Sequence, residues 1–241
     1  MEENGMNVSD KEAARKGCTF YCFSPPVMLA TFTIESALAV YTLFRYRKGL
    51  FSKAVAAILS LLAIFQLSEY QICGDRSALF WARIGFVATT LLPVMGLYLV
   101  SLITRKRHFL RAGYVVASVF VLLFVLTPTN IISPACGGNY VIFSGPEQVF
   151  WFYSAYYLGF VMLGIWESVE GLSASRSKRV HRLLRWMVVA YLSFMLPTGI
   201  VYAAYAPARL AVASVMCGFA VIMALILAFQ VVPKYYRYSQ T

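Results

Sequence analysis

Residues 79–104 read LFWARIGFVATTLLPVMGLYLVSLIT, and the basic run Arg105-Lys106-Arg107 follows directly. Arg83 is the one charged residue in this stretch. A helix needs roughly 20 apolar residues to cross a hydrocarbon core of about 30 Å, and this stretch is longer than that. It therefore predicts a transmembrane helix that ends at a charged border.

Six other stretches of the chain have the same character. Hydrophobic residues make up 60% of the sequence and charged residues 13%, whereas a soluble domain is about half apolar and about a quarter charged. The predicted fold is therefore an all-α integral membrane protein, a seven-transmembrane helix bundle over residues 25–233. A tail (1–24), a long connector (127–148) and a second tail (234–241) lie outside its helices. The predicted spans are 26–44, 51–72, 79–104, 109–126, 149–169, 183–205 and 208–232.

Basic residues fall in every second connector between the spans. The other connectors carry little charge, such as Asp75 with Arg76, Glu147 and Arg209. Because basic connectors stay in the cytoplasm, this alternation predicts an N-terminus outside the cell membrane and a cytoplasmic C-terminus. The basic connectors contain Arg45, Arg47, Lys48 and Lys53, then Arg105, Lys106, Arg107 and Arg111, then Arg176, Lys178, Arg179, Arg182 and Arg185, and finally Lys234 and Arg237.

The formal net charge of +11 fits the same topology. Anionic cytoplasmic lipids attract basic residues at the membrane surface at about 1 kcal/mol each. The expected partner of these residues is therefore the lipid bilayer, and no binding of nucleic acid is expected.

The five cysteines lie at positions 18, 22, 73, 136 and 217. The predicted topology places the first four on the oxidising side of the membrane, where four cysteines allow three pairings. A Cys73–Cys136 bond would join two outer connectors, and free thiols are the alternative. Cys18 and Cys22 lack the further ligands of a zinc site, so no metal is expected.

The connector 127–148 is the longest and lies on the outer side. Residues 139–143 read NYVIF and lie among glycines and prolines. This pattern predicts a short strand and a small hairpin over the outer ends of the helices.

Ionisable residues at membrane depth carry a free-energy cost and are functional hypotheses by default. Glu69 lies near the outer end of the second span, and Arg83 lies at comparable depth in the third, so an ion pair between them is predicted. Gln66, one helical turn below Glu69, would extend this network. The pair would either lock the two helices together or form the polar floor of a ligand pocket.

Glu35 lies near the middle of the first span, where no partner is evident. It would be protonated and hydrogen-bonded to a Tyr or Ser, or it would face a wet cavity and couple to protons or cations. Glu167 and Glu170 lie beside a basic connector, and we expect both on a solvated face of salt bridges.

The chain is not expected to be an enzyme. Its last span has no Lys for a retinal Schiff base, and neither an HExxH motif nor an intramembrane Asp pair occurs. Phosphate-binding and dinucleotide-binding motifs are absent as well, so no cofactor is expected.

Several short motifs occur in a fixed order along the chain: Glu69 near the end of the second span, Trp81-x-Arg83 with Gly85 and Leu92-Pro93 in the third, Thr129-Asn130 after the fourth, and Gly145-Pro146 before the aromatic-rich fifth. This order resembles the seven-transmembrane N-terminal sensor region of bacterial histidine kinases and diguanylate cyclases. The resemblance runs from about the first span to the last and has the same N-outside topology. It implies a membrane sensor coupled to a cytoplasmic output domain.

No kinase, cyclase or PAS domain follows the last span in this sequence, so we expect signalling through a separate partner protein. The expected function is that of a sensor or receptor-like module that binds an outer or membrane-borne ligand beneath the long connector. Ligand binding would then move the helices that Pro93 and Pro197 are predicted to kink. The expected ligand-binding residues are Glu69, Arg83, Trp81, Gln66 and Glu35.

Two other functions remain open from the sequence. Glu35 favours a small proton- or cation-coupled transporter or channel. A structural subunit of a larger membrane complex is the second alternative, and assembly with further copies of the chain stays open in each case.

Overall fold

The computed structural model describes residues 25–46, 49–74, 77–126, 133–136, 141–205 and 211–239. The predicted tail 1–24 with Cys18 and Cys22, and the Thr129-Asn130 motif, lie outside these residues. The elements, in chain order, are α2 (Pro25–Arg45), α3 (Leu50–Cys73), α4 (Ala78–Thr104), α5 (Leu110–Leu126), β1 (Ser133–Cys136), β2 (Val141–Ser144), α6 (Glu147–Ala174), α7 (Lys178–Ala204), α8 (Val212–Ile226), the π-helical segment η3 (Leu227–Val231) and α9 (Val232–Ser239).

The helices confirm an all-α bundle of apolar segments, as expected of a multi-pass membrane protein. Within the described residues, six helical stretches are long and apolar enough to cross a membrane, and α5, with 17 residues, is a shorter apolar helix. The number of spans and the side on which each terminus lies stay predictions.

Two helices extend well beyond their predicted spans. α6 continues to Ala174 and α7 begins at Lys178, whereas the apolar runs end at 169 and begin at 183. The added residues include Glu, Lys and Arg, which are good helix formers although they are polar. Hydropathy marks only the part of a helix that lies in hydrocarbon, so it underestimates helices that continue into the interface.

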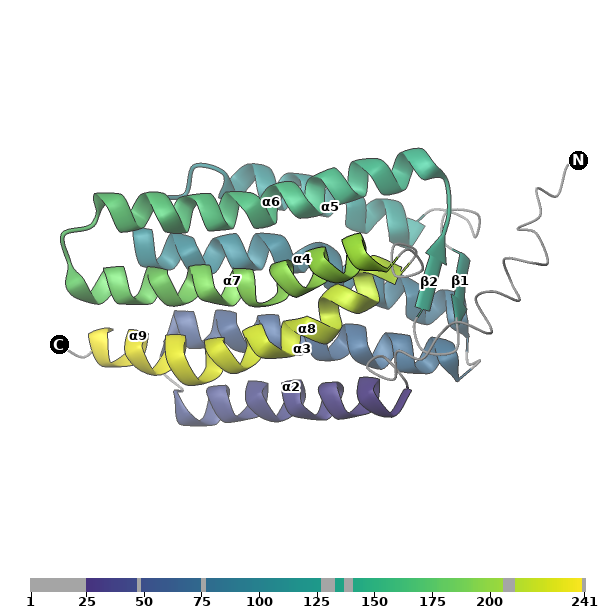
Figure 1. Cartoon of the computed structure of the whole chain (residues 1–241), viewed down its shortest axis with the longest axis horizontal. Helices are drawn as coiled ribbons and strands as arrows, with labels where there is room; N and C mark the ends of the chain where they lie inside the picture. The colour runs from purple at the N-terminus through teal and green to yellow at the C-terminus, as the bar shows by residue number, and fades with distance from the viewer. Residues whose placement is uncertain are drawn as a thin grey trace, which may run out of the picture.

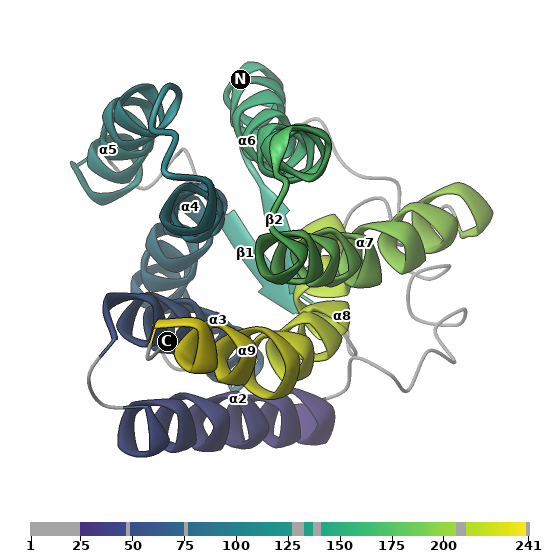
Figure 2. The same ribbon diagram turned by 90° about the vertical axis from the view of Figure 1, so that its left-hand side faces the viewer.

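The helices α2, α3, α4, α6, α7 and α8 form a ring around the main core, and α5 packs on α4 outside this ring. Seen from one end, α5, α4, α3 and α2 follow one another as neighbours (Figure 2). α6 packs on α4, and α7 packs on α6. The continuous helical run α8–η3–α9 contacts α2, α3 and α7 and closes the ring (Figures 1 and 2).

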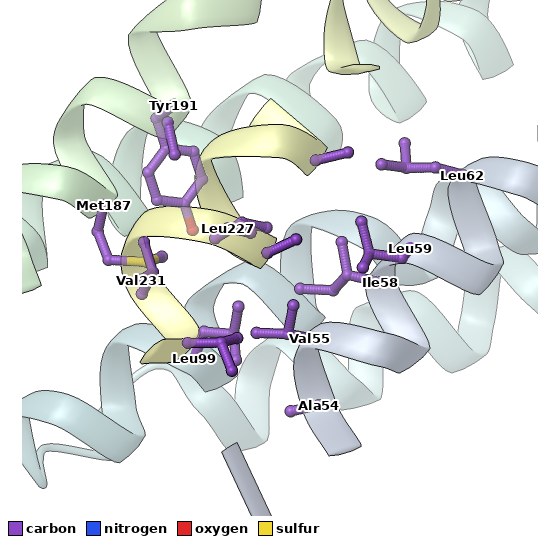
Figure 3. Close-up of a cluster of buried hydrophobic side chains, with 14 of the residues drawn as sticks. Ala54, Val55, Ile58, Leu59, Leu62, Leu99, Met187, Tyr191, Leu227 and Val231 are labelled. Carbon is purple, nitrogen blue, oxygen red and sulfur yellow. The ribbon is translucent and has the colours of Figure 1, made fainter. Parts of the chain in front are cut away.

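The core is built mainly by α3 and α4, which are the most buried helices. Val55, Leu59, Leu99 and Leu184 are fully buried in its main cluster, together with Leu227 of η3. Figure 3 shows side chains of this cluster converging from α3, α4, α7 and η3. In a bilayer, such close side-chain packing takes the place of the hydrophobic effect as the force between helices.

Both prolines expected to kink helices lie inside continuous helices, Pro93 in α4 and Pro197 in α7. A proline removes one helix hydrogen bond and disturbs the preceding turn. In α4 that turn receives a tertiary hydrogen bond, because Tyr156 Oη of α6 donates to the Thr90 carbonyl at 2.6 Å. The turn before Pro93 is thus tied to the neighbouring helix α6.

The predicted hairpin is present and covers one end of the bundle, which we call the hairpin end. β1 and β2 pair antiparallel, with Ser133 opposite Ser144 and Cys136 opposite Val141. The structure joins Cys73, the last residue of α3, to Cys136 by a disulfide, with 5.1 Å between the two Cα atoms. Figure 1 shows the hairpin at the end opposite to α9.

Removing this disulfide should destabilise the protein. The bond closes a loop over a sequence separation of 63 residues, so we expect the C73S/C136S variant to lose about 2–4 kcal/mol of unfolding free energy. Thermal unfolding in detergent, with and without reductant, measures the effect. Reductant should lower the melting temperature of the natural chain and leave that of the double variant unchanged. Equal melting temperatures of the natural chain and the C73S/C136S variant, both measured without reductant, would contradict the expectation.

Candidate functional site

The candidate functional site is a buried polar cluster beneath the hairpin, centred on Glu69 of α3. The Glu69 side chain is 1% exposed. Ser214, in the first turn of α8, donates a hydrogen bond to Glu69 Oε1. The backbone N–H of Val141 in β2 donates to the same Ser214 oxygen at 3.4 Å. One hydroxyl group therefore joins α3, α8 and the hairpin.

The predicted ion pair between Glu69 and Arg83 is not found among the contacts of the described residues. Glu69 has Ser214 as its partner instead, and Arg83 is partly buried on α4. The two residues were predicted to meet because they lie at similar depth on adjacent helices. Equal depth does not make two side chains face each other, and Glu69 faces α8.

Side chains of β2 fill the space beneath the hairpin. Val141 is fully buried, and the Phe143 ring packs edge-on against Phe86 of α4 with 4.9 Å between the ring centroids. Trp81 is partly buried in the same cluster and packs against Phe80. A ligand approaching Glu69 from this end would have to displace the hairpin.

Glu35 of α2 is a second acidic residue in the same interior. It is 0% exposed, and neither of its carboxylate oxygens has a hydrogen-bond partner among the described residues. Glu35 lies close enough to Glu69 for the two carboxyl groups to influence each other electrostatically, and Cys217 of α8 lies within the same range of both. Gln66 is buried one turn from Glu69. The structure thus buries three of the five predicted site residues and leaves Arg83 and Trp81 only partly buried.

A small cavity lies beside Cys217 in the middle of the bundle. Its volume is about 30 Å³, and apolar side chains from α3, α4, α6, α7, α8 and η3 form most of its wall. A buried water needs roughly 10–15 Å³ of such volume and about 2–4 polar partners, and this largely apolar wall offers few polar groups. Its titratable lining residues are Tyr157, Tyr191 and Cys217.

Two glycines make room for the hydroxyl group of Tyr191. A Cβ atom at Gly96 of α4 would lie 2.6 Å from Tyr191 Oη, and one at Gly164 of α6 would lie 2.5 Å from it. The hydroxyl therefore sits between the backbones of α4 and α6. It is buried and has no hydrogen-bond partner in the described part of the chain. Figure 3 shows the ring pointing from α7 into the core.

Glu167 is buried, contrary to the expectation of a solvated salt-bridge face. It is 5% exposed, its Oε2 has no partner among the residues described, and it interacts electrostatically with Tyr191. Glu170 does behave as expected, because its Oε1 lies 2.6 Å from Lys106 Nζ on the surface. The spacing of Gly164, Glu167 and Gly171 on one helix face was a signal for burial that the charge of Glu167 concealed.

The comparisons with known proteins add no identification. No protein-family model matches the chain, and no curated protein matches it either. The resemblance to bacterial sensor regions stays a prediction.

Replacing Ser214 with Ala should loosen the hairpin. The substitution removes the hydrogen-bond donor to buried Glu69 and leaves the carboxylate unsatisfied, which costs about 1–3 kcal/mol. We expect a lower melting temperature and faster amide hydrogen exchange at Val141. Ser118→Ala is the matched control, because that exposed hydroxyl bonds only to a carbonyl of its own helix. Equal exchange in the two variants would contradict the expectation.

Replacing Gly164 with Ala should destabilise the packing of α6 on α7. Its added methyl group would collide with the Tyr191 hydroxyl, and overpacking of this kind costs about 1–3 kcal/mol. Gly159→Ala is the control on the same helix, because a Cβ there meets no atom within 4 Å. Thermal unfolding should show a loss for Gly164→Ala and no loss for Gly159→Ala. An equal loss of stability in both variants would show that collision with Tyr191 is not the cause.

Proposed function

We propose that this chain is a membrane sensor module whose hairpin receives the signal and whose α8–η3–α9 run transmits it. The observation that carries the proposal is the hydroxyl group of Ser214, which links the hairpin to α8 through Val141 and to α3 through Glu69. An outer or membrane-borne ligand that displaces the hairpin would break this link. Such a ligand changes the equilibrium only if it binds the displaced state more tightly.

The charge distribution supports an outward-facing hairpin in the cell membrane. Basic connectors favour the cytoplasmic side, and a disulfide persists on the oxidising side. Both rules give the same orientation, with the N-terminus outside and the C-terminus in the cytoplasm. The basic residues at the end opposite the hairpin, which we call the basic end, are Arg45, Lys53, Arg105, Lys106, Arg107, Arg111, Arg176, Lys178, Arg179, Arg182, Arg185, Lys234 and Arg237.

The run α8–η3–α9 connects the site to the basic end without a break. There Tyr235 stacks on Phe51 of α3 with 4.0 Å between ring centroids. Lys234 Nζ lies 4.8 Å from the ring centroid of Trp186 on α7. A shift of α8 along or about its axis would change both contacts, since small helix shifts at packed interfaces are a common form of switching.

The predicted site residues take different roles in this proposal. Glu69 and Gln66 belong to the buried coupling network, and Glu35 lies beside it. Arg83 and Trp81, less buried on α4, would contact the ligand when the hairpin moves. A separate signalling protein would bind the basic end and detect the change.

Fluorine NMR with 5-fluorotryptophan can test transmission, because the four tryptophans of the chain report on both ends. Trp81 and Trp151 lie near the hairpin end, and Trp166 and Trp186 near the basic end. Ser214→Ala should shift the resonances of both Trp81 and Trp186, because it releases the hairpin from α8. Ser118→Ala should shift neither.

The test depends on which tryptophan resonances shift in Ser214→Ala. If Ser214→Ala moved only the resonances of Trp81 and Trp151, the hydroxyl would fix the hairpin locally and the proposed transmission would be wrong. Reducing the disulfide in the natural chain provides a second perturbation of the hairpin, and the same distant shift at Trp186 is expected.

A further inference from the structure

An open hollow lined by basic side chains lies where α6 ends and α7 begins. Figure 1 shows this start of α7 at the basic end of the bundle. The volume of the hollow is about 350 Å³, within the roughly 300–1,000 Å³ of ordinary small-molecule pockets. We call it the basic hollow, and its described lining residues are Arg176, Lys178, His181, Arg182 and Arg185.

The protein does not neutralise the positive charge of the basic hollow. None of the four Lys and Arg residues that line it forms an ion pair within the described residues. On the neighbouring helix α6, Glu170 already pairs with Lys106, and Glu167 is buried. Like charges that lie this close together repel one another, so an anion in the basic hollow would relieve the repulsion.

The start of α7 favours an anion for a second reason. Negative groups are stabilised near a helix N-terminus, because the first N–H groups have no partner within the helix and carry a partial positive charge. α7 has no acidic residue in its first turn, and its N-cap residue Ser177 makes no capping hydrogen bond with its side chain. A phosphate group suits both features, since it binds to helix N-termini and accepts paired hydrogen bonds from Arg.

One face of α7 changes from basic to apolar along its length. Exposed residues follow one another there at spacings of three, four or seven, which places them on a single stripe of the helix. This stripe consists of Lys178, Arg182, Arg185, Val189, Leu196 and Ile200. The change from basic to apolar falls between Arg185 and Val189. A phospholipid has the same polarity, with an anionic headgroup next to apolar chains, so it matches the stripe better than a soluble anion does.

We propose that the basic hollow binds the headgroup of a phospholipid with more than one negative charge, whose acyl chains lie along the apolar part of the α7 stripe. A single negative charge would leave most of the lining Lys and Arg residues unneutralised, whereas further phosphate groups would pair with them. Basic pockets at the ends of membrane helices bind lipid headgroups of this kind. The site does not depend on the proposed sensor function.

Binding of defined lipids to the full chain in detergent tests the proposal. The probes are short-chain phosphatidylinositol bisphosphate, phosphatidylglycerol and phosphatidylcholine, whose headgroups carry several negative charges, one, and no net charge. Native mass spectrometry counts the bound lipids and gives their dissociation constants. We expect the affinity to fall in the order in which the probes are named. Binding of phosphatidylglycerol as tight as that of the bisphosphate lipid would overturn the proposal, and so would the absence of binding.

Substitutions in the basic hollow test its position. The R182Q/R185Q variant should bind phosphatidylinositol bisphosphate about 25-fold more weakly, since each basic residue near a membrane surface contributes about fivefold. Lys178→Gln should weaken binding about fivefold. Should R182Q/R185Q fail to unfold thermally like the natural chain, Lys178→Gln alone decides the position of the site.

The matched control removes two basic residues elsewhere at the same end. The K53Q/R111Q variant changes exposed residues of α3 and α5 that do not line the basic hollow. It should bind the lipid as tightly as the natural chain. An equal loss of affinity in the two double variants would show a general attraction to the basic end and would overturn the site.

The soluble headgroup distinguishes a lipid from a free anion. Inositol trisphosphate carries phosphate groups like those of the lipid probe but has no acyl chains. We expect it to bind at least about tenfold more weakly than the lipid, because the chains hold the lipid in the same micelle as the basic hollow and raise its effective concentration. Equal affinities would make the basic hollow a site for a soluble anion and would overturn the binding of lipid.

Discussion

Hydrocarbon offers no hydrogen-bond partner to a polypeptide, and this constraint determines where the chain places its backbone, its hydroxyl groups and its strands. Its backbone is helical wherever it crosses the bundle, because a helix satisfies its own N–H and C=O groups. Hydroxyl side chains follow the same rule: Thr31, Ser68, Thr90 and Ser168 each bond to a carbonyl of their own helix. The described strands are placed at one end, where they pair with each other and lie over the helices.

Polar groups that the backbone cannot satisfy become the links between helices. The Tyr156 hydroxyl bonds to the turn before Pro93, and the Ser214 hydroxyl bonds to Glu69. In a bilayer such bonds are worth only about 0.6–2 kcal/mol each, because the unfolded chain also finds partners. Their effect here is on position: they fix which helix face meets which neighbour, and so they hold the hairpin, α3 and α8 in one arrangement.

The order of the helices, the short hairpin and the polarity of charge follow from local sequence, since runs of apolar residues, glycines and basic clusters each act within a few positions. The site does not follow in this way. Glu69 was recognised as a buried acidic residue, but Ser214, its partner, lies 145 positions away, and its identity depends on how α3 rotates in the finished bundle. The burial of Glu167 was not predicted, because its charge indicated an exposed residue although small residues share its helix face. Tyr191 was missed because the space for its hydroxyl group forms only when Gly96 of α4 and Gly164 of α6 come together.

α5 differs from the other helices of the bundle in one respect that has a physical consequence. Its 17 residues rise about 25 Å, less than the hydrocarbon thickness of about 30 Å. It packs on α4 and touches α6 only slightly, while Val115, Val119 and Leu126 face outward. If α5 crosses the bilayer as the sequence predicts, the lipid beside it would have to thin, or α5 would slide toward one surface. The hairpin is the next element after α5 in the chain, so in such a bilayer the membrane thickness would act as a mechanical load on the hairpin.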